Sequence, residues 1–307
     1  HRRRRHVAAG CVGRYDWQAA SAFATRRRSF PNHQRNGATA IDTWIETQCE
    51  IAFDDGMNAP MVLVLRPQSN AHQWVAENRF HIDPIVTVTE YVDPYGNRGQ
   101  RLTAPSGPFR IRTQSTVLTA GAADRAPGAP FVLIQDLPPE VLTYLLPSRY
   151  CESDRLGPDA RRIVGNRRPG YDQVARIVEW VQQEIAYVPG SSNTLVSAME
   201  VKARGAGVCR DLSHLAISLC RSLSIPARMV VGYLEGLEPM DLHAWFEAFV
   251  GGRWYTFDPI MRHLDGGRVM LALGRDGADV PVFNQFGPPV IPRSIDVGVR
   301  RTGTRDF

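Results

Sequence analysis

Three residues in the second half of the chain carry the side chains that one nucleophilic site requires. Cys209 follows two glycines, His243 lies in an apolar and aromatic run, and Asp258 closes a short aromatic run. A cysteine attacks a carbonyl carbon as its thiolate, an imidazole accepts the thiol proton, and a carboxylate fixes the imidazole tautomer. The types and order of these residues therefore predict acyl transfer by a cysteine nucleophile.

The residues around Cys209 predict the start of an amphipathic helix. Gly205 and Gly207 interrupt the chain before it, and apolar residues then recur at three- and four-residue spacing as far as Leu223, before Pro226. Cys209 would lie in the first turn, where unpaired backbone N–H groups and the helix dipole stabilise negative charge. Such a position favours a thiolate, and the same N–H groups could hold an oxyanion.

The residues around His243 and Asp258 predict a β-hairpin. An apolar run ends at Val250, two glycines follow, and a second run starts at Arg253, which is the pattern of two strands joined by a two-residue turn. With Val250 opposite Arg253, Trp245 lies opposite Asp258. His243 and Asp258 then become diagonal neighbours on one face, about 7–8 Å apart between backbones. A register slip of one residue would place them on opposite faces.

These segments resemble the core of the transglutaminase-like superfamily, a group of papain-like thiol enzymes that includes transglutaminases, cysteine proteases and amidases. The resemblance covers about 171–258, in the family's order. It rests on Gly-Val-Cys-Arg-Asp at 207–211, Ile-Pro-Ala-Arg at 225–228, Val-Gly-Tyr at 231–233, His-Ala-Trp-Phe-Glu at 243–247 and Trp-Tyr-Thr-Phe-Asp-Pro at 254–259.

The resemblance implies both a fold and a set of roles. It implies an α+β fold, in which a helix carrying the cysteine packs on an antiparallel sheet, preceded by an all-β N-terminal domain. It also implies that Cys209 is the nucleophile, His243 the base and Asp258 the orienting residue. The family leaves the reaction open, because the acyl-enzyme can pass its acyl group to water or to an amine. We expect a hydrolase of the protease or amidase type, since no sequence feature indicates a tunnel that would admit an amine. A transglutaminase and a non-catalytic binding module of the same fold are the alternatives.

Other residues near the motifs have structural interpretations. Cys209 itself could be a buried small apolar residue, and Cys220, in the apolar stripe of the same helix, is expected in the core. His214 is five residues from Cys209, about 140° around the helix, so we expect it to cap or support rather than act as base. Asp211 suits the positive end of the helix dipole, and Glu247 is interpreted as structural.

Three residues are candidates for substrate binding. Trp245 flanks His243 on the same strand face and could wall the acyl site, although core packing is the commoner role of a tryptophan. The resemblance implies that the loop before the nucleophile helix can border the cleft, which adds Tyr187 and Ser192.

The sequence predicts no metal and no cofactor. The five cysteines contain no C-x-x-C, the eight histidines are scattered, and no phosphate-binding glycine motif stands out. The expected partner is a peptide or protein substrate, and the oligomeric state stays open. No apolar run reaches the roughly 18–20 residues of a membrane span. Unclustered cysteines fit a reducing compartment, so we expect a cytoplasmic protein.

Charge is concentrated at the start of the chain. The net charge is +5, but residues 1–35 hold nine arginines and one acidic residue, which leaves the remainder mildly acidic. Such a segment could bind nucleic acid. We prefer a disordered tail, or an extension foreign to the native protein, and do not expect nucleic-acid binding. The segment lacks the apolar core of a signal peptide.

The pattern along the chain predicts five regions. The expected boundaries are a basic tail at 1–40, a β-sandwich-like domain at 41–120, a linker with a short helix between 137 and 146 at 121–170, the catalytic domain at 171–286 and a loosely ordered tail at 287–307.

Overall fold

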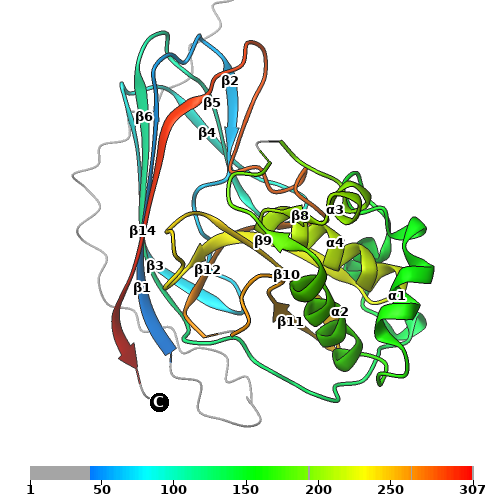
Figure 1. The fold of residues 1–307 in the computed structure, drawn as a ribbon. Helices are drawn as coiled ribbons and strands as arrows, with labels where there is room; N and C mark the ends of the chain where they lie inside the picture. The colour runs from blue at the N-terminus through cyan, green and yellow to red at the C-terminus, as the bar shows by residue number, and fades with distance from the viewer. Residues whose placement is uncertain (1–41, 193, 264, 306–307) are drawn as a thin grey trace, which may run out of the picture. The chain divides into compact units, whose positions relative to one another are not determined.

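Three four-stranded sheets and a layer of helices make up the described part of the chain (Figure 1). The computed structural model describes residues 42–192, 194–263 and 265–305, so the basic tail and Cys11 lie outside it. The strands are β1 (Asp42–Phe53), β2 (Pro60–Leu63), β3 (Gln73–Asp83), β4 (Val88–Val92), β5 (Arg98–Thr103), β6 (Phe109–Ala120), β7 (Ala186–Tyr187), β8 (Ala206–Gly207), β9 (Ala227–Leu234), β10 (His243–Val250), β11 (Arg253–Phe257), β12 (Arg268–Gly274), β13 (Phe283–Gln285) and β14 (Pro292–Arg305). The helices are η2 (Ile134–Asp136), η3 (Pro139–Leu145), η4 (Ser153–Arg155), α1 (Gly157–Val164), α2 (Tyr171–Glu184), α3 (Ala198–Arg204) and α4 (Cys209–Ser222), where η marks a 3-10 helix.

Two antiparallel sheets form a β-sandwich, with strand orders β14-β1-β6-β3 and β13-β2-β5-β4. In β1, Thr43, Ile45, Thr47 and Cys49 are buried while the residues between them are more exposed. This two-residue period is typical of a strand with one face on a core. The all-β N-terminal part of the predicted fold is therefore confirmed. Its core is built by Ile45, Ile51, Phe53, Met61, Leu63, Leu102, Phe109, Ile111 and Val117.

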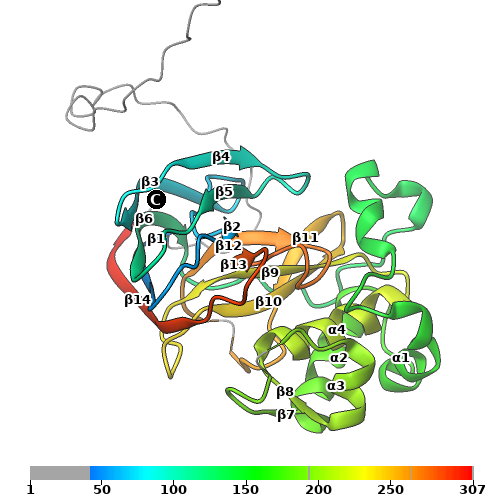
Figure 2. The same ribbon diagram turned by 90° about the horizontal axis from the view of Figure 1, so that it is seen from above.

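The third sheet, β11-β10-β9-β12, lies between the sandwich and the helices (Figure 2). We call it the central sheet. One of its faces contributes Ala244, Phe246 and Ala248 to the core that includes α2 and α4. Its other face contributes Tyr233 and Val269 to the core of the sandwich. The predicted α+β class, with a cysteine-bearing helix on an antiparallel sheet, is confirmed, and the two halves of the molecule share apolar cores through this sheet.

The elements predicted to carry the site are present with the expected ends. α4 begins at Cys209 and ends at Ser222. β10 and β11 form the predicted hairpin, with Val250 paired to Arg253. Both turn residues, Gly251 and Gly252, have positive φ, 58° and 84°, which a two-residue turn of type I′ requires and which glycine tolerates best.

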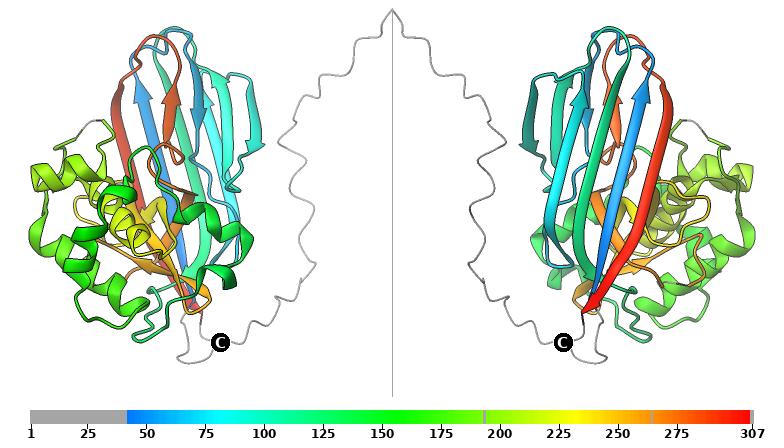
Figure 3. Two further views of the ribbon diagram at one scale, coloured as in Figure 1. Left: turned by 90° about the vertical axis from the view of Figure 1, so that its right-hand side faces the viewer. Right: turned by 90° about the vertical axis from the view of Figure 1, so that its left-hand side faces the viewer.

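The prediction of a loosely ordered tail from Gly287 is wrong. The segment forms β14, which pairs antiparallel with β1 along nearly the whole length of both strands (Figure 3). Only one face of this edge strand meets the core, through the half-buried Val297 and Val299. A strand with one solvated face and few apolar residues gives a weak sequence signal, which is why its arginines and proline suggested a tail.

The segment 121–170, predicted as a linker with one short helix, holds more structure. The short helix is the 3-10 helix η3, flanked by η2, η4 and α1. α1 buries Ala160, Ile163 and Val164 in the same core as α2 and α4. The half of the molecule that carries Cys209, His243 and Asp258 therefore starts before Tyr171, its predicted beginning.

The pairing of β14 with β1 gives a test on stability. Val297 lies opposite Cys49 and packs on the sandwich core, whereas its neighbour Asp296 is exposed. Val297→Asp should lower the free energy of unfolding by about 1–3 kcal/mol because it places a charge against the core, and Asp296→Ala should change it by less than about 0.5 kcal/mol. Urea denaturation of both variants measures this, and equal midpoints would mean that the segment is not part of the sheet.

Candidate active site

Cys209 is the first residue of α4, and Asp211 closes the start of that helix. The N–H of the N-cap residue, Val208, donates to Oδ2 of Asp211 at 3.2 Å. Asp211 is fully buried. A Cβ on Gly207 would lie 2.9 Å from the Cβ of Asp211, so glycine there allows the carboxylate to fold back over the helix end. Asp211 therefore has the structural role predicted for it, although it is buried rather than solvated.

Ser192 lies at the same helix end. Its hydroxyl donates to the carboxylate of Asp211 and accepts from Nη2 of Arg210 at 3.1 Å. Arg210 also donates to the carbonyl of Thr194 at 2.8 Å. These bonds fasten the loop before α3 to the start of α4. They account for Ser192 without a substrate, so its predicted role in substrate binding stays a prediction.

Tyr187 is brought close to Cys209 by the short parallel pair of β7 and β8. Tyr187 pairs with Gly207, two residues before Cys209, and the N–H of Val188 donates to the carbonyl of Gly207 at 3.0 Å. The side chain of Tyr187 is 43% exposed. Partial burial raises the pKa of its phenol, and the charges of Cys209, Asp241 and Asp258 raise it further. The predicted substrate-facing position of Tyr187 is consistent with this geometry.

His243 and Asp258 form a buried hydrogen-bonded pair. Nε2 of His243 lies 2.8 Å from Oδ2 of Asp258, and each residue is 1% exposed. The other carboxylate oxygen accepts from the backbone N–H groups of Ile260 and Met261, both at 3.1 Å. Gln182 of α2 donates to the backbone carbonyl of Asp258 at 3.1 Å. The diagonal contact predicted from the hairpin register is present.

The protonation of this pair follows from its surroundings. Burial alone lowers the pKa of His243, but the hydrogen bonds and charges of Asp258 and Cys209 outweigh burial and raise it to about 9. Burial alone raises the pKa of Asp258, yet its bond with His243 and the charges of His243 and Arg268 bring it below its ordinary value. At neutral pH the pair is imidazolium and carboxylate. Because Asp258 occupies Nε2, Nδ1 is the nitrogen left to face Cys209.

Trp245 holds the imidazole from the side. Its ring stacks on that of His243, with centroids 6.0 Å apart and planes at 28°. Gly232 of β9 pairs with His243 of β10 and makes room for the Trp245 ring. A Cβ on Gly232 would lie 2.9 Å from that ring and 2.0 Å from the carbonyl oxygen of Val269. With 2% of its surface exposed, Trp245 supports His243 and leaves little surface for a substrate to contact.

Comparison with known proteins agrees with this fold. Residues 159–259 match the model of the transglutaminase-like superfamily, and residues 54–118 match that of the bacterial transglutaminase-like N-terminal region. A solved structure from Cytophaga hutchinsonii, described as a candidate cysteine protease, aligns with a TM-score of 0.80 and 32% identity over 87% of this chain and 92% of that chain. The chain belongs to the transglutaminase-like superfamily.

A protein from Mycobacterium leprae is similar in sequence to this chain. This uncharacterised protein is 28% identical over 233 residues, which is 70% of this chain and 82% of its own length. The two matched family regions correspond to the β-sandwich and to the segment from α1 to the end of the hairpin. The resemblance inferred from the motifs is confirmed.

Among the cysteines in the described ranges, Cys209 alone is partly exposed, and all four are free. Burial raises the pKa of the Cys49 and Cys151 thiols to about 12 each. Burial also raises the pKa of the Cys220 thiol, which is fully buried as predicted. A thiol is reactive as its accessible thiolate, so in this superfamily member Cys209 is the thiol suited to chemistry.

His214 and Glu247 have structural partners. Nδ1 of His214 donates to the carbonyl of Val196 at 2.8 Å, and Nε2 accepts from the N–H of Gly277 at 3.0 Å. Burial lowers the pKa of His214 to about 4, so it stays neutral. Glu247 pairs with Arg228, whose Nε and Nη2 lie 2.7 and 2.6 Å from its Oε2. Both residues fit the supporting roles predicted for them.

Arg268 is the residue near the site that sequence reasoning missed. Arg268 begins β12, and its Nη2 lies 3.4 Å from Oδ2 of Asp258. No spacing rule connects these residues, because strand order brings them together rather than sequence. The hydrogen-bond donors to Asp258 thus come from β10, from the turn after β11 and from β12.

No metal cluster or membrane helix emerges from the residues that the structure describes. Within 42–192, 194–263 and 265–305, no three His, Cys, Asp or Glu side chains converge as metal ligands. In the same ranges, no helix combines the length and the apolar character needed to cross a bilayer.

The His243–Asp258 bond gives a prediction on protonation. Asp258→Asn removes the larger of the two side-chain contributions that oppose burial, so the pKa of His243 should fall from about 9 by about one unit or more. Two-dimensional NMR of ring-labelled histidine measures the titration. Asp241→Asn, which neutralises an exposed carboxylate near Tyr187, is the matched control and should leave the titration unchanged. A His243 pKa that stays above 8 in Asp258→Asn would contradict this account.

Proposed function

We propose that this protein is a thiol-dependent acyl-transfer enzyme that acts on peptide or side-chain amide bonds. Cys209 is the nucleophile, His243 the general acid and base, and Asp258 the residue that orients His243. The observation that carries the proposal is the buried His243–Asp258 pair beside a partly exposed cysteine at a helix N-terminus. Membership of the transglutaminase-like superfamily supports it.

The first half-reaction forms a thioester. The Cys209 sulfur attacks the amide carbon, a C–S bond forms, and the carbonyl electron pair moves to oxygen. The backbone N–H of Cys209, at the start of α4, is placed to stabilise that oxyanion. His243, protonated at neutral pH, gives its Nδ1 proton to the leaving nitrogen as the C–N bond breaks. The amine leaves and the acyl group stays on Cys209.

The second half-reaction regenerates the enzyme. His243, now neutral, takes a proton from water as the water oxygen attacks the thioester carbon. The C–S bond breaks, the carboxylic acid leaves, and Cys209 and His243 return as a thiolate and an imidazolium. Asp258 stays ionised throughout and holds the imidazole through Nε2, as the carboxylate of a serine or cysteine triad does.

Water is the acyl acceptor that we favour. The Cytophaga hutchinsonii structure, which aligns over most of both chains, is described as a candidate cysteine protease. A peptide or protein is the substrate that this proposal requires. The exposed face of Tyr187, next to Cys209 through β7 and β8, is the surface proposed to meet it, with Ser192 and Trp245 in supporting positions. A partly exposed free thiol persists best in a reducing compartment, so we propose a cytoplasmic site of action. Transfer to an amine, and binding without turnover, are the alternatives.

Alkylation of Cys209 tests the nucleophile. Iodoacetamide should label Cys209 rapidly well below pH 8 in the unaltered chain, because Cys209 lies at a helix N-terminus beside the His243 imidazolium. In His243→Ala the rate should fall by about tenfold or more at pH 6.5 and follow an ordinary thiol, which ionises near 8.5. Mass spectrometry locates the label, and Cys209→Ala is the blank. Identical titrations near pH 8.5 in both proteins would favour the binding module instead.

The acyl acceptor can be measured directly. A glutamine-containing peptide library incubated with a labelled primary amine in water should give free acid faster than amine-linked product. Both products should vanish in Cys209→Ala and persist in Cys220→Ala, which removes a buried thiol from the same helix. Amine-linked product forming faster than free acid would identify a transglutaminase.

A further inference from the structure

Polar side chains of the β-sandwich form hydrogen bonds to the outer edge of the central sheet, β11-β10-β9-β12. β12 is an edge strand that pairs only with β9 among the described strands. The hydroxyl of Thr119 donates to the carbonyl of Arg268 at 3.0 Å. The side-chain amide of Gln73 accepts from the N–H of Met270 at 2.8 Å and donates to the carbonyl of the same residue at 2.9 Å. The sandwich thus supplies the hydrogen bonds that a further strand would give.

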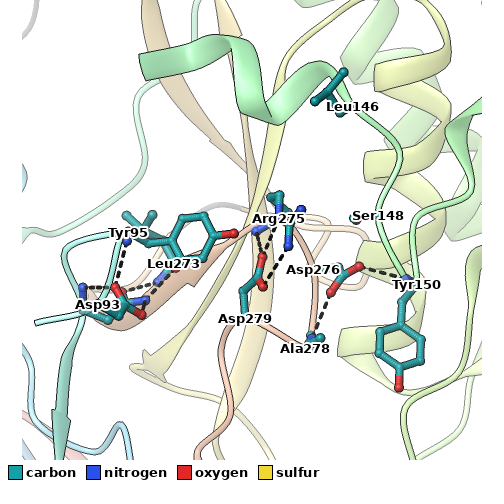
Figure 4. A network of polar contacts seen from close by, with 12 residues as sticks. Asp93, Tyr95, Leu146, Ser148, Tyr150, Leu273, Arg275, Asp276, Ala278 and Asp279 are labelled. Atoms are coloured by element: carbon teal, nitrogen blue, oxygen red, sulfur yellow. Dashed lines mark hydrogen bonds and ion pairs between the residues drawn. The ribbon is translucent and has the colours of Figure 1, made fainter. Parts of the chain in front are cut away.

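A second amide repeats this contact further along β12. Asn97 accepts from the N–H of Leu273 and donates to its carbonyl, both at 2.8 Å. Its amide also donates to Asp93 at 2.8 Å, so the turn between β4 and β5 is braced against the strand. Figure 4 shows Asp93, Tyr95 and Leu273 in this part of the molecule. Gln73 and Asn97 are each 5% exposed. Buried amides with both functions bonded to one backbone residue fix the strand in register.

The chain that follows β12 is braced in the same region. Arg275 donates to Asp279 at 2.9 Å, and Asp276 accepts from the N–H of Tyr150 at 2.8 Å, as Figure 4 shows. These contacts hold β12 at its far end. Its first residue, Arg268, is held by Thr119, so both ends of the strand are fixed.

Arg268 carries this constraint to the site. Its side chain is 8% exposed, and its Nη2 lies 3.4 Å from Oδ2 of Asp258, the same oxygen that bonds to His243. Nη1 donates to the carbonyl of Gly266 at 3.4 Å. One carboxylate oxygen therefore lies between an imidazolium and a guanidinium.

We propose that Arg268 is a positioning residue for the proposed acyl transfer. Thr119, Gln73 and Asn97 hold the backbone of β12, the strand that Arg268 begins. Arg268 in turn fixes Asp258 and limits the basicity of His243. The inference rests on the proposed function for its catalytic meaning, but its physical content concerns the His243–Asp258 pair alone. A cation beside the shared oxygen weakens the attraction of that oxygen for the imidazolium. The imidazole then gives up its proton to a leaving group more easily than it would beside an unopposed carboxylate.

The charged and titratable groups around the pair come from three elements and two loops. Cys209 comes from α4, Tyr187 from β7 and Arg268 from β12. Asp265 acts on Arg268, and Asp241 acts on Tyr187. In this set Arg268 is the permanent cation, so its removal should shift the protonation of His243 in one direction, upward.

The test is an NMR titration of ring-labelled His243 in the full chain carrying Cys209→Ala, in which the thiol no longer contributes. Arg268→Gln should raise the pKa of His243 by about 0.5–1 unit, and Arg268→Lys, which keeps the charge, should shift it by less than half as much. Gln73→Ala and Asn97→Ala should shift it upward by a smaller amount because they loosen β12. Gln114→Ala, which removes an exposed amide from β6 of the same sandwich, should have no effect.

Two results would overturn the inference. A His243 pKa that is unchanged or lower in Arg268→Gln, with only the melting temperature reduced, would make Arg268 a purely structural residue. If Arg268→Gln does not fold, the Asn97→Ala titration decides in the same way. The readout needs neither substrate nor turnover, so it is separate from the alkylation experiment, in which failure of the proposed function would be seen.

Discussion

The hydrogen bond between His243 and Asp258 is the interaction on which the rest of the site depends. A carboxylate taken out of water is costly unless its oxygens are bonded and its charge is opposed. Here the backbone N–H groups of Ile260 and Met261 hold one oxygen, and the imidazole and the guanidinium of Arg268 share the other. The pair can be buried because β10, the turn after β11 and β12, all belonging to the central sheet, supply its hydrogen-bond partners. The imidazole is fixed by the sheet rather than by a mobile loop, which is a condition for catalysis by a preorganised group.

Cys209 meets this pair because a different set of contacts fixes the start of α4. Asp211 closes the helix end from inside, and the β7–β8 pair brings Tyr187 alongside. Gly207 permits the close approach of Asp211, and Gly232 permits that of the Trp245 ring. Cys209 and His243 are thus held by separate layers of the molecule, helix and sheet, which meet through the apolar contacts of α4 with Phe246 and its neighbours.

Sequence reasoning succeeded where the deciding contacts are local. The start of α4 at Cys209 follows from glycines and apolar spacing, and the hairpin register follows from the Gly251-Gly252 turn. It failed for β14 and Arg268, because their partners lie far away in sequence. β14 has one solvated face and little apolar character, so its pairing with β1 leaves no periodic signal. Arg268 reaches Asp258 only after strand order has placed β12 beside β9.

The pairing of β1 with β14 also has a consequence for how the chain reaches its native state. These strands are the first and the last that the structure describes, and the helices and the central sheet lie between them in sequence. Until β14 has been synthesised, one edge of β1 carries unpaired backbone groups, which are a template for association with other chains. Contacts between such distant segments are slow to form because loop closure must come first. Completion of the sandwich therefore has to wait until the helices and the central sheet have been synthesised, and until then one edge of β1 is open to association with other chains.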